Sequence, residues 1–598
     1  MFKQISLAIV TLAACLLPIS VLAQISGVTT FGDSLSDNGN TFRATGGLQP
    51  PSPPYFNGRF SNGPVWIENV TSNFNLSTTS NNFAFGGATS GTGNTIVIPT
   101  VTLPGLTTQL DGFLQASPKV DPNRLFVVWA GANDYLGGGQ INPAVPVGNL
   151  STAVQRLTAA GATQLVVPNL PDLGKIPAGA ADPALSAGLT QLSAAHNSLL
   201  SASLRSLASN NPNISIVPTD LGALFNTVIT NPARFGLTNV TQPCLNTATG
   251  AVCATPDTYL FWDTLHPTAA GHRIIGAFAF DTLAAPQTIA PQVTSVLSST
   301  RRQTGDVNGR LLALRTTPAS GERKLAAFVT GDLNTGDRQK TSTTTGFNID
   351  TKGVTIGVDY PVTDRIVIGL AASNSSSNNQ LNNNKGKVGL NNTAVSIYGS
   401  YQQDKLYADA LISYGWDSFD LTRRINVTGF DRATANPSGN RVSAGISGGY
   451  DFGANGLSIG PIVGVRYTKV NINGYTEQNG DILNLKVNPQ QADSVLFNIG
   501  AQVAYPFRTD FGTLSPYISA SYERELANNS RQIVTELVTQ PGIPLRTKIA
   551  ADGPDFVRLS TGLQAQFTNN LAVGVGYERL FGSNASENNL NAQLRFQF

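Results

Sequence analysis

Residues 571–598 read LAVGVGYERLFGSNASENNLNAQLRFQF, and they indicate how the C-terminal half of the chain folds. Leu571, Val573, Val575 and Tyr577 alternate with small or polar residues, and a similar alternation leads up to the final Phe598. A period of two residues is typical of a β-strand with one apolar and one polar face. The end of the chain therefore predicts two strands that each separate an apolar from a polar environment.

The same alternation recurs throughout residues 324–598. Twelve segments show it, at 324–334, 346–361, 365–375, 387–402, 405–421, 440–452, 457–472, 493–507, 512–525, 555–567, 571–581 and 588–598. Their lengths straddle the roughly 9–11 residues that a tilted strand needs to cross a bilayer. An even number of strands fits an outer-membrane barrel of twelve strands. A soluble β-sandwich or a β-helical stalk is the alternative interpretation.

The first 23 residues, MFKQISLAIVTLAACLLPISVLA, indicate export. Lys3 is followed by an apolar stretch and by a small-residue cleavage site, the pattern of a secretory signal peptide. The residues that end at Cys15 resemble a lipobox, so a lipoprotein signal is the alternative. Once residues 1–23 are removed, only Cys244 and Cys253 remain. In an exported chain this spacing favours one small disulfide loop over a metal site.

Residues 24–285 have a different pattern, which predicts an α/β layered domain. Short apolar runs at 125–129 and 164–168 read as buried strands, and leucines at helical spacing fill 187–208. Alternation of such units favours a parallel sheet, whose functional sites lie at the carboxyl ends of the strands.

Proline residues separate this region from the strand-rich half. Pro286 and Pro291 predict a break, and about 293–316 has the length of a helix that could pass through a barrel. We therefore expect a signal peptide at 1–23, an α/β domain at 24–285, a linker with a helix at 286–323, and a barrel at 324–598.

The charge of the chain excludes one large class of function. Lys and Arg number 38 against 36 Asp and Glu, which gives a net charge of +2, and charged residues make up only 12% of the chain. A chain with so few basic residues is not a nucleic-acid binder, and its 41% hydrophobic content is too high for a disordered protein.

A serine and a histidine with a nearby carboxylate are the candidate catalytic residues. Ser34, in Gly-Asp-Ser-Leu, follows a strand-like run, a position from which a hydroxyl can act as a nucleophile. Asp263 precedes His266 by three residues, so it can accept the Nδ1 proton and leave Nε2 free to deprotonate Ser34. Of the two other histidines, His196 is expected half-exposed in a helix, and His272 is expected to cap or pack.

Acyl transfer also needs hydrogen-bond donors for the developing oxyanion. The stretch 82–88, NFAFGGA, offers a backbone N–H at Gly86 or Gly87, where the absence of a side chain allows close approach. Asn133 follows another apolar run and offers a side-chain amide.

Four sequence blocks have now been named: those that contain Ser34, Gly86 and Gly87, Asn133, and Asp263 with His266. Together and in this order they resemble the GDSL branch of the SGNH hydrolases over about 26–285. The resemblance implies that Ser34 is the nucleophile, His266 the base and Asp263 the residue that orients it. It also implies an oxyanion hole made by Ser34 N–H, Asn133 Nδ2 and a glycine N–H, and Gly87 aligns better with the family pattern than Gly86. Residues 290–598 resemble the autotransporter translocator domain, so the whole chain is similar to the GDSL autotransporter esterases of Gram-negative bacteria.

This resemblance implies a carboxylic-ester hydrolase, either a lipase or a short-chain esterase, that works through an acyl-enzyme. It implies an outer-membrane location with the α/β passenger domain kept attached on the cell surface. The expected partners are an ester substrate, outer-membrane lipids and the barrel-assembly machinery. No metal or cofactor is implied, because two cysteines are too few for a closed zinc site and no HExxH or phosphate-binding loop occurs. The alternatives are an adhesin with an inactive passenger, and a pore that carries an extra domain.

Overall fold

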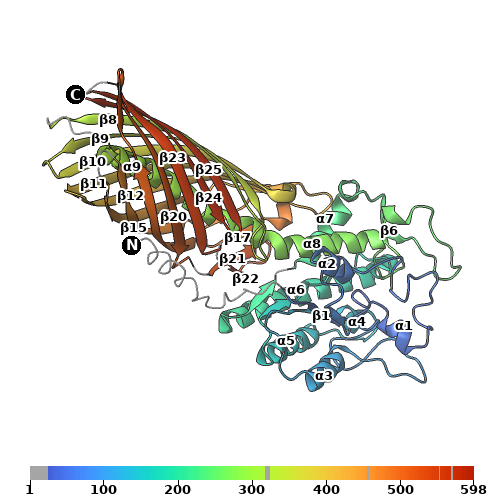
Figure 1. Cartoon of the computed structure of the whole chain (residues 1–598). Coiled ribbons are helices and arrows are strands. Elements are labelled where there is room, and N and C mark those ends of the chain that lie inside the picture. The colour runs from blue at the N-terminus through green and yellow to red at the C-terminus, as the bar shows by residue number, and fades with distance from the viewer. Residues whose placement is uncertain are drawn as a thin grey trace.

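The computed structural model describes residues 25–217, 219–316, 323–453, 457–528, 530–550, 553–567 and 570–598. The predicted signal peptide at 1–23, with its lipobox-like Cys15, lies outside these described residues. An α/β domain and a β-barrel lie end to end, and helices pass from the one into the other (Figure 1). The predicted fold class, an α/β domain joined to an all-β barrel, is confirmed.

The α/β domain is built on a five-stranded parallel sheet in the order β2-β1-β3-β4-β5. The strands are β1 (Val28–Gly32), β2 (Asn81–Asn82), β3 (Leu125–Trp129), β4 (Gln164–Val166) and β5 (Ser215–Val217). Strand β3 reads LFVVW and is buried along its whole length. An uninterrupted apolar run is expected there, because both faces of a parallel sheet are covered.

Helices cover both faces of this sheet and make three layers. On one side the core includes α2 (Trp66–Asn73), α7 (Leu221–Thr230) and α8 (Ala269–Ile289). On the other it includes α3 (Leu106–Ala116), α5 (Ala144–Ala159) and most of α6 (Pro183–Asn210). Two short helices, α1 (Asn40–Ala44) and α4 (Ala132–Leu136), follow soon after β1 and β3, so their first residues lie at the carboxyl edge of the sheet.

The connection between the two bodies is helical almost without interruption. Helix α8 continues through Pro286 and ends at Ile289, and α9 (Pro291–Thr316) begins after a single intervening residue. The junction thus lies at Ala290, between the two prolines that predicted a break, and Pro286 itself is inside α8. Pro291 suits the first position of α9, because the amide hydrogen that proline lacks would have no partner within the helix there.

No helix within the described ranges is long and apolar enough to span a membrane.

The barrel consists of twelve antiparallel strands in a closed ring. Closure comes from the last strand, which pairs with the first along its whole length, so that Leu594 lies opposite Val329 and Phe596 opposite Ala327. The ring is formed by β8 (Ala326–Arg338), β9 (Phe347–Pro361), β10 (Ile366–Leu381), β11 (Gly386–Gln403), β12 (Leu406–Arg424), β14 (Ser438–Tyr450), β15 (Ser458–Ile472), β18 (Gln490–Ala504), β20 (Gly512–Glu525), β23 (Asp555–Gln566), β24 (Leu571–Gly582) and β25 (Ala585–Gln597).

The strands are longer than a bilayer requires, and the excess lies at the end that faces the α/β domain. Exposed aromatic residues near the far end include Tyr450 and Phe596, and a second set, which includes Trp416 and Tyr522, lies well along the strands. Aromatic girdles of this kind mark the two membrane interfaces. On β12 the stretch from Leu406 to Trp416 has the roughly 9–11 residues of a spanning strand, and β12 continues beyond it to Arg424.

Polar contacts hold α9 inside the barrel. Arg310 on α9 donates two hydrogen bonds to Asp359 of β9, at 2.7 and 2.8 Å. Arg302 contacts both Asp306 of its own helix and Asp332 of β8. Each of these charges faces an opposite charge, which is the condition under which buried charges are tolerated.

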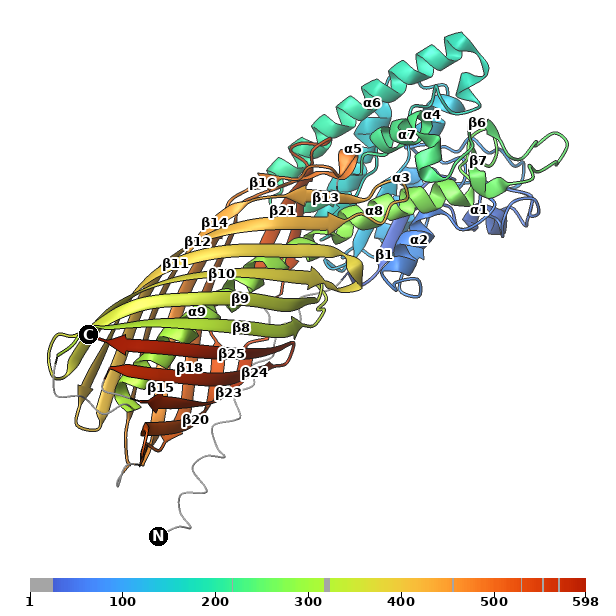
Figure 2. The ribbon, with the colours of Figure 1, turned by 90° about the horizontal axis from the view of Figure 1, so that it is seen from above.

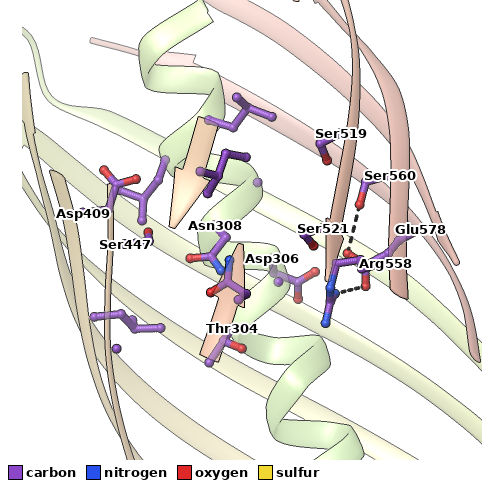
Figure 3. A pocket seen from close by; sticks show the side chains of 18 of the residues that line it. Thr304, Asp306, Asn308, Asp409, Ser447, Ser519, Ser521, Arg558, Ser560 and Glu578 are labelled. Atoms are coloured by element: carbon purple, nitrogen blue, oxygen red, sulfur yellow. Dashed lines mark hydrogen bonds and ion pairs between the residues drawn. The ribbon is translucent and has the colours of Figure 1, made fainter. Parts of the chain in front are cut away.

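A cavity of about 230 Å³ remains between α9 and the barrel wall. Figure 3 shows polar side chains around it, including Asn308 from the helix and Ser521 from β20, with Arg558 bonded to Glu578. This cavity belongs to the barrel lumen, and none of the candidate catalytic residues lines it.

The domain-facing end of the barrel forms a platform for the α/β domain. Four short strands make a small sheet there: β16 (Tyr475–Thr476), β17 (Leu485–Val487), β21 (Arg531–Leu537) and β22 (Leu545–Ile549). Figure 1 labels β17, β21 and β22, and Figure 2 labels β16 and β21. Barrel residues such as Phe430 and Ile533 share one apolar cluster with Phe235 and Leu283 of the α/β domain. The rings of Phe235 and Phe430 meet edge to face with centroids 5.6 Å apart.

One buried carboxylate fastens this contact. Asp281 on α8 accepts hydrogen bonds from the backbone N–H of Asn426 and of Val427, and its other oxygen accepts from the Asn426 side chain at 2.7 Å. Asp281 is only 5% exposed, and its hydrogen bond from the Val427 N–H is buried as well.

We expect Asp281→Ala to destabilise the α/β domain on its platform by about 1–3 kcal/mol, because the buried N–H of Val427 and the partly buried N–H of Asn426 lose their acceptor. Thermal unfolding and protease sensitivity of the detergent-solubilised full chain would measure this. Asp257→Ala is the matched control, since Asp257 pairs with Arg273 in the solvent at 3.1 Å and such pairs contribute little. Equal stability of the two variants would contradict a fastening role for Asp281.

Deletion of 594–598 should prevent membrane insertion, because the end of β8 would lose its partner and leave backbone groups unsatisfied in lipid. Heat-modifiable migration on gels and surface accessibility on cells would report insertion. A full-length Ser34→Ala chain is the control for loss of chemistry without loss of insertion. Normal insertion of the deleted chain would contradict the closure described above.

Candidate active site

Ser34 lies directly beyond the end of β1, at the carboxyl edge of the sheet. The turn is tight at Gly32, where a Cβ atom would come within 2.3 Å of the carbonyl oxygen of Trp129 on the neighbouring strand. Ser34 is 8% exposed, so its hydroxyl is at the surface of the domain but largely shielded. Asp33 beside it is fully buried, and burial raises its pKa to about 7 although the backbone N–H of Leu35 bonds to it.

The structure brings Ser34, His266 and Asp263 into one chain of contacts. Nε2 of His266 lies 2.8 Å from Ser34 Oγ, and Nδ1 lies 2.7 Å from Asp263 Oδ2. Asp263 and His266 are in the loop between β7 (Tyr259–Phe261) and α8. The backbone N–H groups of Leu265 and His266 both donate to Asp263 Oδ1 at 2.8 Å, so the three-residue spacing closes a small turn around the carboxylate.

The surroundings of Asp263 keep it ionised. Burial by itself would raise its pKa, but the charge of His266 and hydrogen bonds from His266, Tyr55 and Leu265 hold the pKa at about 2. The carboxylate is therefore ionised near pH 7, where it can stabilise a protonated imidazole.

The other two histidines do not approach Ser34. His196 is fully buried in α6, with Nδ1 3.0 Å from the hydroxyl of Tyr135, so the expectation of a half-exposed side chain is wrong. His272 is also fully buried in α8 and accepts a hydrogen bond from the Trp66 N–H at the start of α2. Burial lowers the pKa of His196 to about 4 and that of His272 to about 3, so both remain neutral near pH 7.

The candidate oxyanion donors come from three segments of the domain: the Ser34 loop, the glycine loop at 86–87 and the start of α4, which carries Asn133. The N–H of Gly86 is already used, because it donates to Asp37 at 2.9 Å and to the Thr41 hydroxyl at 2.7 Å. Among the described residues no protein acceptor takes the N–H of Gly87 or of Ser34. Asn133 uses one amide hydrogen on the carbonyl oxygen of Ala88 at 3.1 Å and retains the other. Of the two glycines, Gly87 is thus the one with a free donor.

Two buried aspartates, which sequence reasoning missed, join these loops. Asp37 accepts from the backbone N–H groups of Gly39, Thr41 and Gly86, and so links the Ser34 loop to the glycine loop. Asp134 accepts from both the N–H and the hydroxyl of Ser90, and so links the glycine loop to the Asn133 helix. Asp37 lies close to Ser34 in sequence, and Asp134 directly follows Asn133. Nothing in the sequence, however, indicates which distant N–H group each carboxylate contacts.

A third group missed by sequence reasoning contacts the catalytic candidates directly. The hydroxyl of Tyr55 donates to Asp263 Oδ2 at 2.7 Å across 208 positions of sequence. Nothing in the local sequence around Tyr55 predicts this contact.

Cys244 and Cys253 form a disulfide in the structure, and they close a hairpin in which Leu245 pairs with Val252. This hairpin packs on Trp262, the residue before Asp263. Within the described ranges no group of three or more His, Cys, Asp or Glu side chains is placed to hold a metal ion.

An apolar cavity of about 70 Å³ borders the site. Leu35, Leu265 and Pro267, the neighbours in sequence of Ser34 and His266, contribute to its wall. Helices α7 and α8 supply most of the rest, including Phe225 and Ile275. The edge of the sheet therefore offers an apolar surface next to a polar, hydrogen-bonded serine.

Both the α/β domain and the barrel are similar to known proteins. Residues 28–278 match the family described as GDSL-like Lipase/Acylhydrolase, and residues 327–578 match the Autotransporter beta-domain. Esterase EstA of Pseudomonas aeruginosa is 26% identical over 82% of this chain and 78% of its own length. Lipase 1 of Photorhabdus luminescens is 25% identical over 87% of this chain and 88% of its own length. The translocator domain of NalP from Neisseria meningitidis superposes with a TM-score of 0.41 at 16% identity, over 50% of this chain and 98% of that domain.

The barrel lies in the outer membrane, and the α/β domain is a passenger on the cell surface. Since both family matches and the relatives named esterase and lipase agree with the fold, residues 28–278 form a GDSL-like lipase/acylhydrolase domain, residues 327–578 form an autotransporter β-domain, and the protein is an enzyme that hydrolyses ester bonds.

Proposed function

We propose that the enzyme hydrolyses carboxylic esters through an acyl-enzyme on Ser34, with His266 as the base and Asp263 as the residue that orients it. The observation that carries this proposal is the continuous set of contacts from Ser34 Oγ to His266 Nε2, and from Nδ1 to Asp263, at 2.8 and 2.7 Å. A nucleophile, a base and an oriented carboxylate at these distances are the parts that acyl transfer to serine requires.

The first half of the reaction forms the acyl-enzyme. Ser34 Oγ attacks the ester carbonyl carbon while His266 Nε2 takes the hydroxyl proton. The carbonyl oxygen becomes an oxyanion, which accepts hydrogen bonds from Ser34 N–H, Gly87 N–H and Asn133 Nδ2. The tetrahedral intermediate then breaks the bond to the leaving alcohol, and His266 gives that alcohol its proton.

The second half returns the enzyme to its starting state. Water attacks the acyl carbonyl while His266 Nε2 takes one of its protons, and the same donors stabilise the second oxyanion. The Ser34 Oγ–acyl bond breaks, the proton returns from His266 to Ser34, and the carboxylic acid leaves.

The neighbours of the two reacting residues support an apolar acyl group. Leu35 and Leu265 stand beside Ser34 and His266 and contribute to the apolar cavity at this edge. Burial of a hydrocarbon acyl chain there would be favourable, because apolar area leaves water. The names esterase and lipase among the relatives agree with esters of this kind.

We further propose that residues 1–23 direct export, that 24–285 form the passenger, and that 286–323 form the linker to a barrel at 324–598 inserted by the barrel-assembly machinery among outer-membrane lipids. The passenger stays attached in this proposal. The ion pairs of α9 with the barrel wall and the apolar contact on the platform support attachment. An adhesin with an inactive passenger is not favoured, since its catalytic contacts need not have been kept.

We expect Ser34→Ala and His266→Ala each to lower kcat by roughly 10⁴-fold or more, because either change removes the acyl transfer route. Hydrolysis of a chromogenic short-chain ester by the full chain in detergent would measure the loss. Unchanged thermal unfolding would show that each variant remains folded. Retention of activity by His266→Ala would contradict the assignment of the base.

Asn133→Ala should lower kcat by roughly 10²–10³-fold with little change in KM, as for a donor that acts mainly in the transition state. Asn149→Ala is a useful control, because its amide donates to the hydroxyl of Ser90 within the surrounding loops and not at Ser34. A loss confined to KM would instead make Asn133 a substrate-binding residue.

A further inference from the structure

The carboxylate of Asp263 is held from three directions. Two backbone N–H groups bond to Oδ1, and His266 Nδ1 lies 2.7 Å from Oδ2. The third direction is the hydroxyl of Tyr55, which donates to Oδ2 at 2.7 Å. The same oxygen therefore meets both the imidazole and the phenol, and the position of Tyr55 bears on the orientation of His266.

Tyr55 is itself fixed by its own loop. Its N–H donates to the carbonyl oxygen of Pro51, and its carbonyl oxygen accepts from the hydroxyl of Ser52 at 2.6 Å. Its ring meets Phe60 edge to face with centroids 6.3 Å apart, and Phe60 in turn lies 5.1 Å from the ring of His266. The loop that carries Tyr55 thus contacts both members of the Asp263–His266 pair.

The disulfide hairpin supports the other side of Tyr55. Trp262 meets the Tyr55 ring edge to face at 6.3 Å and is buried against Cys244 and Leu245. Because Trp262 precedes Asp263, the hairpin holds the tyrosine and the backbone of the aspartate together. The contacts with Phe60 and Trp262 use only the ring of Tyr55. The hydroxyl makes a separate contact, with the carboxylate of Asp263.

We infer that Tyr55 is a positioning residue of the reaction, whose hydroxyl holds Asp263 Oδ2 in place for His266. The inference rests on the proposed function. A hydrogen bond to the ionised carboxylate stabilises its charge, so that the proton taken from Ser34 stays on His266 and is available for the leaving alcohol. It also limits rotation of the carboxylate, because it gives Oδ2 a second donor beside His266 Nδ1 while the two backbone donors hold Oδ1.

Tyr55→Phe in the full chain tests this inference, since it removes the hydroxyl and keeps the ring. We expect kcat for p-nitrophenyl butyrate to fall about tenfold while KM stays within about twofold. Tyr259→Phe is the matched control, because Tyr259 belongs to the same cluster around Trp262 and its hydroxyl does not meet Asp263. That variant should retain the parent kcat.

The pH profile separates a positioning role from a packing role. Loss of a donor raises the proton affinity of the Asp263–His266 pair, so the acid limb of kcat/KM should move to higher pH by about half a unit or more. Asp33 and His272 also act on the charge of His266, but both are present in the parent and in the variant. The shift between parent and variant therefore reports Tyr55 alone.

A double-mutant cycle completes the test. In an Asp263→Asn background, Tyr55→Phe should change kcat less than twofold, because the group through which it acts is altered. An equal tenfold loss in both backgrounds, or no loss and no acid-limb shift in the parent, would overturn the inference. If Asp263→Asn itself left kcat unchanged, the proposed function would fail instead, so the two failures are distinguishable.

Discussion

The pairing of β25 with β8 is the constraint on which the rest of the molecule depends. In a membrane an unpaired strand edge leaves backbone groups without partners, so the sheet must close on itself. Closure creates a polar lumen, and the chain before the first strand occupies it as α9, which is why that helix carries arginines and aspartates that meet opposite charges in the wall. The same closure puts α8 and the enzyme at one end of the barrel.

The end of the barrel that faces the α/β domain also supports that domain. The strands are longer than the distance between the two aromatic girdles. Beyond the girdle on the side of the α/β domain, they and their loops supply a small sheet on which that domain rests. The apolar cluster across this contact contains residues from both bodies, and Asp281 satisfies two backbone N–H groups of the barrel loops. The α/β domain thus contacts the barrel through packing as well as through its covalent connection.

Within the α/β domain, buried carboxylates join the segments that carry the candidate catalytic residues. Asp37 and Asp134 bond to backbone N–H groups of neighbouring loops, and Asp263 collects donors from its own turn, from His266 and from Tyr55. Interactions between ions and N–H groups are strong where water is excluded. Among the described residues, the N–H groups of Ser34 and Gly87 have no protein acceptor, so both are available as the proposed oxyanion donors.

The sequence by itself determined those features that depend on short-range pattern. A period of two residues located the twelve strands, since inward and outward faces alternate along each strand, and the spacing of Asp263 and His266 fits one turn. Tertiary structure alone decided which distant groups meet. It continued α8 through Pro286, buried His196, engaged Gly86 with Asp37 so that Gly87 keeps a free N–H, and carried Tyr55 to Asp263. Contacts between residues 49 or 208 positions apart are set by how loops pack on a finished sheet, and such packing leaves no periodic signal in the chain.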